Sequence, residues 1–125
     1  MPQYNSFGEI DSTFTQRDGS RIAILPVPYD RTSTWIKGAD KGPLAVLEAS
    51  QELELYDIET ATEVYRHGIH TCRPVEVDAP PEDMVQKVRE GVLGLHQEGK
   101  FVVTLGGDHS VSIGAALAHI EGERD

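Results

Sequence analysis

Three short apolar runs along the chain predict three strands. Residues 21–26 form the first run, a weaker run lies within 69–77, and the last covers 101–105. The last run is continuous rather than alternating, which is typical of a strand buried on both faces of a parallel sheet. Pro26 and Pro28 end the first run, because proline cannot donate a ladder hydrogen bond.

The segments between and after these runs have the spacing of helices. One helix is expected from Pro43 to about Leu53, since proline at the first helical position loses no hydrogen bond. The clearest helix begins at residues 81–83, where acidic side chains suit the helix dipole, and it ends near Gly99. Its apolar residues recur every three or four positions. The last helix runs from Ser110 to about Ile120.

The order of these elements predicts an α/β fold. Strands and helices alternate, and each crossover is long enough for neighbouring strands to be parallel. Residues 1–20 are polar and interrupted by glycine. We expect them to form a loosely structured N-terminal arm that packs on another subunit, and residues 21–125 to form the α/β domain.

The candidate chemistry lies directly after the last strand. Gly106 and Gly107 permit a tight turn, and the Ser110 hydroxyl is expected to accept from the first turn of the next helix. Between them, Asp108 and His109 lie at a carboxyl strand end, where α/β sheets place ligand sites. A serine triad is excluded, because adjacent residues point in different directions. Two interpretations remain open: a metal-binding imidazole supported by the neighbouring carboxylate, or a capped helix start with a structural histidine.

The loop after the first strand is the second candidate region. Residues 29–41 are rich in threonine, serine and aspartate, and loops at this edge of a sheet often carry binding residues. Asp30, Thr32 and Thr34 are candidates to face a substrate, and Trp35 is a candidate to wall a pocket. A solvated loop with one packed aromatic is the alternative.

Composition narrows the possible partners. The chain has 125 residues, enough for one domain with a core, and a net charge of -10. This charge argues against nucleic acid and anionic membranes as partners and is compatible with a cationic substrate. Cys72 is the only cysteine, which excludes an intrachain disulfide and suggests a reducing, cytoplasmic setting. No stretch approaches the length of a membrane span.

The run Gly-Gly-Asp-His-Ser at 106–110 resembles the first signature of the ureohydrolase family, which contains arginases, agmatinases and formiminoglutamases. Residues 54–60 are similar to a segment found in one set of agmatinases. Further matches to the family's N-terminal region lie at residues 28–30, 32–34, 38–39, 42–43 and 49–50. The resemblance covers about residues 22–120 and favours an agmatinase.

The resemblance implies an arginase-like fold, with a parallel sheet between two layers of helices. It also implies a binuclear Mn²⁺ site in which His109 is a ligand, Asp108 orients the ligands, and Gly106, Gly107 and Ser110 shape the strand end. In the family, two metal ions lower the pKa of a bridging water and hold hydroxide against the guanidinium carbon. An agmatinase converts agmatine and water to putrescine and urea. A small cationic guanidino substrate and a homo-oligomer, a trimer or hexamer, are implied as well.

Two later motifs of the family do not occur in these residues. They are an Asp-Ala-His-x-Asp strand end and an Asp-x-Asp pair, which complete the two-metal site. We therefore expect the N-terminal part of a ureohydrolase, with no catalytic residue within this chain and no activity alone. The alternatives are an arginase, a formiminoglutamase, a non-catalytic ureohydrolase-like assembly module, or an unrelated flavodoxin-like domain in which Asp108 and His109 are structural.

Overall fold

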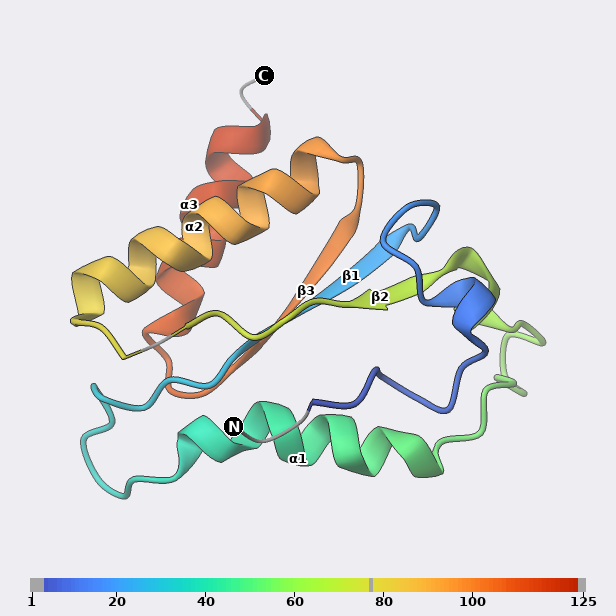
Figure 1. Ribbon diagram of the computed structural model, residues 1–125, viewed down its shortest axis with the longest axis horizontal. Coiled ribbons are helices and arrows are strands. Elements are labelled where there is room, and N and C mark those ends of the chain that lie inside the picture. Colours follow the sequence, from blue (N-terminus) through green and yellow to red (C-terminus); the bar gives the residue numbers. More distant parts are fainter. Residues whose placement is uncertain (1–3, 77, 124–125) are drawn as a thin grey trace.

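The computed structural model describes residues 4–76 and 78–123 (Figure 1). Three parallel strands form one sheet in the order β2-β1-β3. They are β1 (Ile22–Val27), β2 (Ile69–Thr71) and β3 (Phe101–Gly106). β1 pairs with β3 from Ile22 opposite Phe101 to Val27 opposite Gly106. The carboxyl ends of these two strands therefore coincide at one edge of the sheet.

Helices cover both faces of this sheet. The helix α1 (Gly42–Ala49) lies on one side, and α2 (Pro81–Gln97) and α3 (Val111–Glu123) pack together on the other (Figure 1). The expected three-layer arrangement is thus confirmed. The first helix ends earlier than expected and continues as a 3-10 turn, Ser50–Glu52. Among the described residues, no helix combines the length and apolar character needed to cross a membrane.

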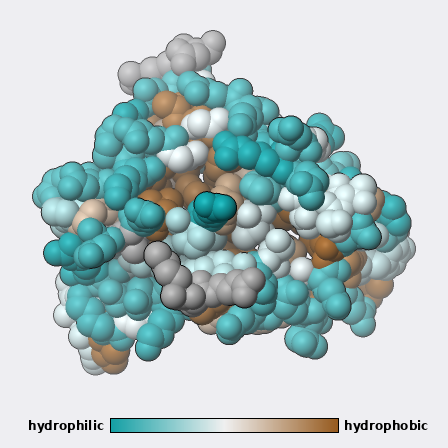
Figure 2. Space-filling model, viewed as in Figure 1, coloured by the Kyte–Doolittle hydropathy of each residue, from teal (hydrophilic) through white to brown (hydrophobic). Residues whose placement is uncertain are grey.

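The main core lies between β1 and the pair α2 and α3. Residues 23–27 of β1 are all buried, so this central strand is covered on both faces. Buried residues of α2 and α3 complete the core: Met84, Val88, Val92, Leu95, Val111 and Ala118. Hydrophilic residues cover most of the face shown in Figure 2, with smaller hydrophobic areas between them.

The prediction that the strand over 101–105 is buried on both faces was wrong. Phe101 is 71% exposed, and residues 102–105 are only partly buried. The reason is the strand order, because β3 is an outer strand and β1 takes the central place. The apolar run therefore predicted the strand correctly but not its position in the sheet.

The N-terminal segment contacts its own chain. The Phe7 N–H donates to Thr71 Oγ1 at 2.9 Å, which ties the segment to the end of β2. The Lys100 ammonium, only 8% exposed, donates to the Ser20 carbonyl oxygen at 2.7 Å. Thr71, at the end of one outer strand, and Lys100, just before the other, thus hold the described part of the arm in place.

Candidate functional site

The turn after β3 is fixed against the exit of β1. The Gly107 N–H donates to the Val27 carbonyl oxygen at 3.1 Å, and the Asp108 N–H donates to the Tyr29 carbonyl oxygen at 2.8 Å. These bonds continue the pairing of the two strands beyond their ends. They place Asp108 and His109 at the carboxyl edge of the sheet, as the sequence indicates.

Hydrogen bonds occupy both carboxylate oxygens of Asp108. Oδ1 accepts from the Ser110 N–H at 2.9 Å and from the Ser110 hydroxyl. Oδ2 accepts from the Thr32 N–H at 3.1 Å and from the Thr32 hydroxyl at 2.6 Å. Partial burial raises the pKa of Asp108, but the hydrogen bonds from Ser110 and Thr32 outweigh it and hold the pKa below its ordinary value. Asp108 is thus an ionised carboxylate engaged in holding its own turn.

The Ser110 hydroxyl does not accept from α3 in the part of the chain that the structure describes, although the sequence predicted this role for it. The Val111 N–H, at the start of α3, lies 3.3 Å from the Asp108 carbonyl oxygen. Asp108 Oδ1 accepts from the Ser110 N–H, which lies before the first residue of α3, so this bond closes the turn between β3 and α3. A carboxylate is a stronger acceptor than a hydroxyl, so the Ser110 side chain becomes a donor to Asp108 rather than an acceptor from α3.

His109 is exposed and borders an open hollow of about 420 Å³. The hollow lies between the turn after β3 and the loop after β1. Its lining consists of Thr32, Ser33, Thr34, Trp35, Ile36, Asp108, His109 and Ser110. In residues 4–76 and 78–123, no hydrogen bond engages the His109 ring. Its imidazole is therefore available to a ligand in the hollow.

The three candidate residues of the loop after β1 have different positions. Thr32 and Thr34 line the hollow beside His109, and so does Trp35, which is 91% exposed. Asp30 does not line it. Asp30 Oδ2 accepts from the Gly38 N–H at 2.7 Å, which closes the loop on itself. The structure thus brings Thr32 and Thr34 to His109, while Asp30 organises the loop.

His109 supplies the one imidazole that borders this hollow. The described part of the chain contains no group of three or more histidine, cysteine, aspartate or glutamate side chains placed to hold a metal ion. Asp108 borders the hollow, but its oxygens are already engaged. His109 fits as one nitrogen ligand in a mixed nitrogen and oxygen set of the kind that manganese accepts. The remaining donors of such a set would lie outside the described residues.

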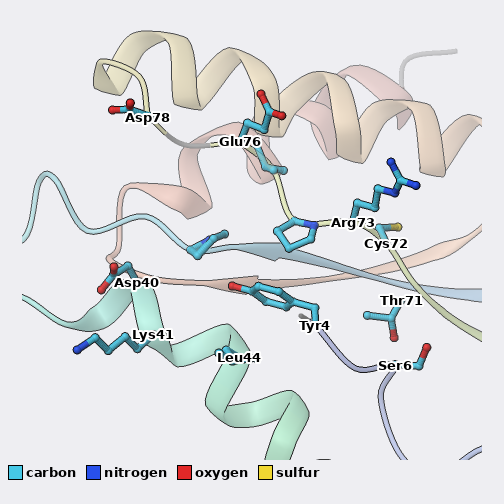
Figure 3. Close-up of a pocket in the computed structure, with 13 residues that line it drawn as sticks. Tyr4, Ser6, Asp40, Lys41, Leu44, Thr71, Cys72, Arg73, Glu76 and Asp78 are labelled. Atoms are coloured by element: carbon cyan, nitrogen blue, oxygen red, sulfur yellow. The ribbon is translucent and has the colours of Figure 1, made fainter. Parts of the chain in front are cut away.

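A second hollow, of about 1150 Å³, was not foreseen from the sequence (Figure 3). It lies between α1, the segment after β2 and the N-terminal segment. Tyr4 lies between α1 and the segment after β2, and burial together with the charge of Asp40 raises the pKa of Tyr4. No pattern in the sequence predicts this hollow, because the N-terminal residues that border it have no periodicity.

The chain is similar in sequence and in fold to known ureohydrolases. The chain is similar to the N(1)-aminopropylagmatine ureohydrolase of Thermus thermophilus, with 40% identity over 116 residues, which is 92% of this chain and 39% of that protein. The protein of the same name from Synechocystis sp. is 39% identical over 103 residues, which is 78% of this chain and 34% of that protein. This chain therefore spans about two fifths of the length of these relatives, or less.

A solved structure supports the same fold. The agmatine ureohydrolase of Thermoplasma volcanium superimposes with a TM-score of 0.78 at 24% identity, over 83% of this chain and 36% of that one. The family model described as Arginase family matches residues 20–124, from just before β1 to the end of α3. This match includes the glycine turn, Asp108, His109 and the loop after β1. The chain belongs to the arginase family.

Proposed function

We propose that this chain serves in a manganese-dependent ureohydrolase that releases urea from a small cationic guanidino compound. The observation that carries the proposal is the position of His109. Its unengaged imidazole borders a hollow at the carboxyl ends of two parallel strands, opposite a loop of hydroxyl side chains. Ligand sites in α/β folds lie at this edge.

The proposed chemistry assigns a separate task to each residue. Manganese, when bound, would supply the positive charge that activates water for attack on the guanidinium carbon. His109 would hold the metal through a ring nitrogen. Asp108 would keep the turn in place, because its oxygens are bound to Ser110 and Thr32. The Thr34 side chain borders the same hollow, where it would contact substrate.

Agmatine and N(1)-aminopropylagmatine are the substrates that we favour. The first has the support of the similar solved structure, named for agmatine, and the second that of the two relatives named above. Both carry a guanidino group and a cationic tail, which the net charge of -10 would attract. We further propose a cytoplasmic enzyme that assembles as a trimer or hexamer.

The chain by itself is expected to release no urea. One free imidazole does not bind two manganese ions, and the described residues supply no further cluster. Titration calorimetry with Mn²⁺ tests this expectation on the wild-type chain and on His109→Ala. Tight binding of about two ions per chain, lost in the variant, would contradict it.

The proposed activity is tested on the product of the whole coding region. Its sequence beyond codon 125 is read for the Asp-Ala-His-x-Asp motif, and urea release is then measured with both substrates and Mn²⁺. His109→Ala should lower the activity at least about tenfold, because a metal ligand is lost. His67→Ala removes another exposed imidazole, outside the hollow, and should leave the activity unchanged. Equal activities of the two variants, or no urea from either substrate, would overturn the proposal.

A further inference from the structure

We propose that Thr32 is a positioning residue for His109, acting through Asp108. Thr32 lies in the loop after β1, and Asp108 lies in the turn after β3, 76 residues later. Two donors of Thr32, its N–H and its hydroxyl, bind the same oxygen of Asp108, at 3.1 and 2.6 Å. This contact joins the two sides of the hollow that His109 borders.

The hydroxyl protons show why the contact depends on the Asp108 charge. Three oxygen pairs are in close contact: Thr32 with Asp108, Ser110 with Asp108, and Thr32 with Ser110, the last at 2.9 Å. The two hydroxyls supply only two protons. Bonds to a carboxylate are about twice as strong as bonds between neutral groups, so both protons go to Asp108. The two hydroxyl oxygens are then held side by side by the carboxylate that they share.

The loop after β1 can hold Asp108 in position because hydrogen bonds within the loop fix its own conformation. Asp30 accepts from the Gly38 N–H at 2.7 Å, and the Lys37 ammonium donates to the Asp30 carbonyl oxygen at 2.7 Å. Thr32 therefore binds Asp108 from a closed loop. His109 lies in the chain between Asp108 and Ser110, the two residues that the Thr32 side chain contacts. Fixing those two neighbours fixes the backbone from which the imidazole projects.

Three variants of the loop isolate the hydroxyl of Thr32. Thr32→Val removes the hydroxyl, preserves the shape and retains the N–H donor. Thr32→Ser restores a hydroxyl. Thr34→Val makes the same change two residues away, at a side chain that forms no hydrogen bond within the described ranges. Circular dichroism and thermal unfolding first establish that each variant is folded.

Two readouts are measured by nuclear magnetic resonance on the full chain. Hydrogen exchange of the Ser110 amide reports on the turn and needs no metal. Broadening of the His109 ring signals by Mn²⁺ reports on the imidazole as a ligand, and only this readout rests on the proposed function. Thr32→Val should speed the exchange about tenfold and raise the Mn²⁺ concentration for half-broadening by up to about tenfold. Thr32→Ser should restore both values, and Thr34→Val should change neither.

Each alternative result has a defined meaning. Unchanged amide exchange in Thr32→Val, or equal effects of Thr32→Val and Thr34→Val, would overturn the inference. A global loss of folding in Thr32→Val would also overturn it, by making Thr32 a general structural residue. Absence of Mn²⁺ broadening in the wild-type chain would instead count against the role of His109 in the proposed function, and the amide exchange would still decide the role of Thr32.

Discussion

Gly107 lies directly against the backbone of Tyr29. A Cβ atom built on Gly107 would come within 1.9 Å of the Tyr29 carbonyl oxygen, 2.7 Å of its carbonyl carbon and 2.8 Å of its nitrogen. All three are backbone atoms, so no side-chain rotation can relieve the overlap. The exits of β1 and β3 can approach each other only because residue 107 has no side chain.

Gly107→Ala should therefore destabilise the chain by about 2–3 kcal/mol, in the upper part of the usual range for overpacking. Gly106→Ala is the matched control. A Cβ atom on Gly106 would meet the Val111 side chain at 3.2 Å, and a side chain can shift more easily than backbone. Urea unfolding of both variants measures the difference. Equal losses of stability would contradict this account of the turn.

Two glycines on the packed helices should respond in opposite ways to alanine. Gly94 in α2 has no atom within 4 Å of a built Cβ, so Gly94→Ala should stabilise the chain by about 0.5–1 kcal/mol through helix propensity. Gly114 in α3 lies against α2, where a Cβ would come within 2.5 Å of the Val85 carbonyl oxygen. Gly114→Ala should be destabilising, because the helices would have to separate. Thermal unfolding of both variants tests the contrast, and the same sign for both would refute it.

Local patterns in the sequence were sufficient to predict the strands and the longest helix. The observed bounds of β1, β3 and α2 lie close to those expected, because apolar runs, proline and acidic first turns act on neighbouring residues. The order of strands was not predictable in this way. The run at 101–105 is as apolar as that of β1, but Phe101 is exposed, since β3 has a partner on one side only within the described residues.

The candidate site was predictable in part, for a related reason. The glycine turn and His109 form one contiguous run, so the sequence indicated both. The bond between Thr32 and Asp108 joins residues 76 positions apart and depends on the parallel register of β1 and β3. No spacing rule shows such a contact. The sequence also predicted that the Ser110 hydroxyl would accept from α3, but this hydroxyl donates to Asp108, because an ionised carboxylate is the stronger acceptor.

Asp108→Asn should reduce stability by an amount that depends on pH. The pKa of Asp108 is lower in the folded chain than in the unfolded chain, where it is about 3.9. The ionised carboxylate therefore makes its full contribution to the free energy of unfolding at pH values well above the pKa of the unfolded chain. This contribution is lost as the pH falls through the pKa of the folded chain. The wild-type chain should be more stable than the variant by about 1–2 kcal/mol at pH 7, from the hydrogen bonds of Thr32 and Ser110. Urea unfolding at a series of pH values from 7 downwards should show the difference in stability between the wild-type chain and the variant narrowing as the solution becomes acidic. A gap that is constant with pH would show that the charge of Asp108 is not its source.

The outer edge of β3, which has no partner strand within the described residues, should make the chain self-associate. Phe101 is 71% exposed beside this edge, and α3 exposes Ile113, Leu117 and Ile120 at 45–55%. An unpaired strand edge with exposed apolar side chains favours pairing with another chain. Sedimentation velocity should therefore show association that increases with protein concentration. Phe101→Lys should weaken it severalfold, because a charge opposes edge pairing.

Ile58→Lys is the matched control for this edge. Ile58 is 82% exposed, but it lies far from the β3 edge in the sequence. It lies in the turn between Asp57 and Thr62, which form an isolated β-bridge outside the three-stranded sheet. The two variants change the net charge equally, so a general effect of charge on solubility would weaken association in both. Weaker association in Phe101→Lys alone assigns the contact to the β3 edge. A wild-type chain that remains monomeric at all concentrations would contradict this prediction.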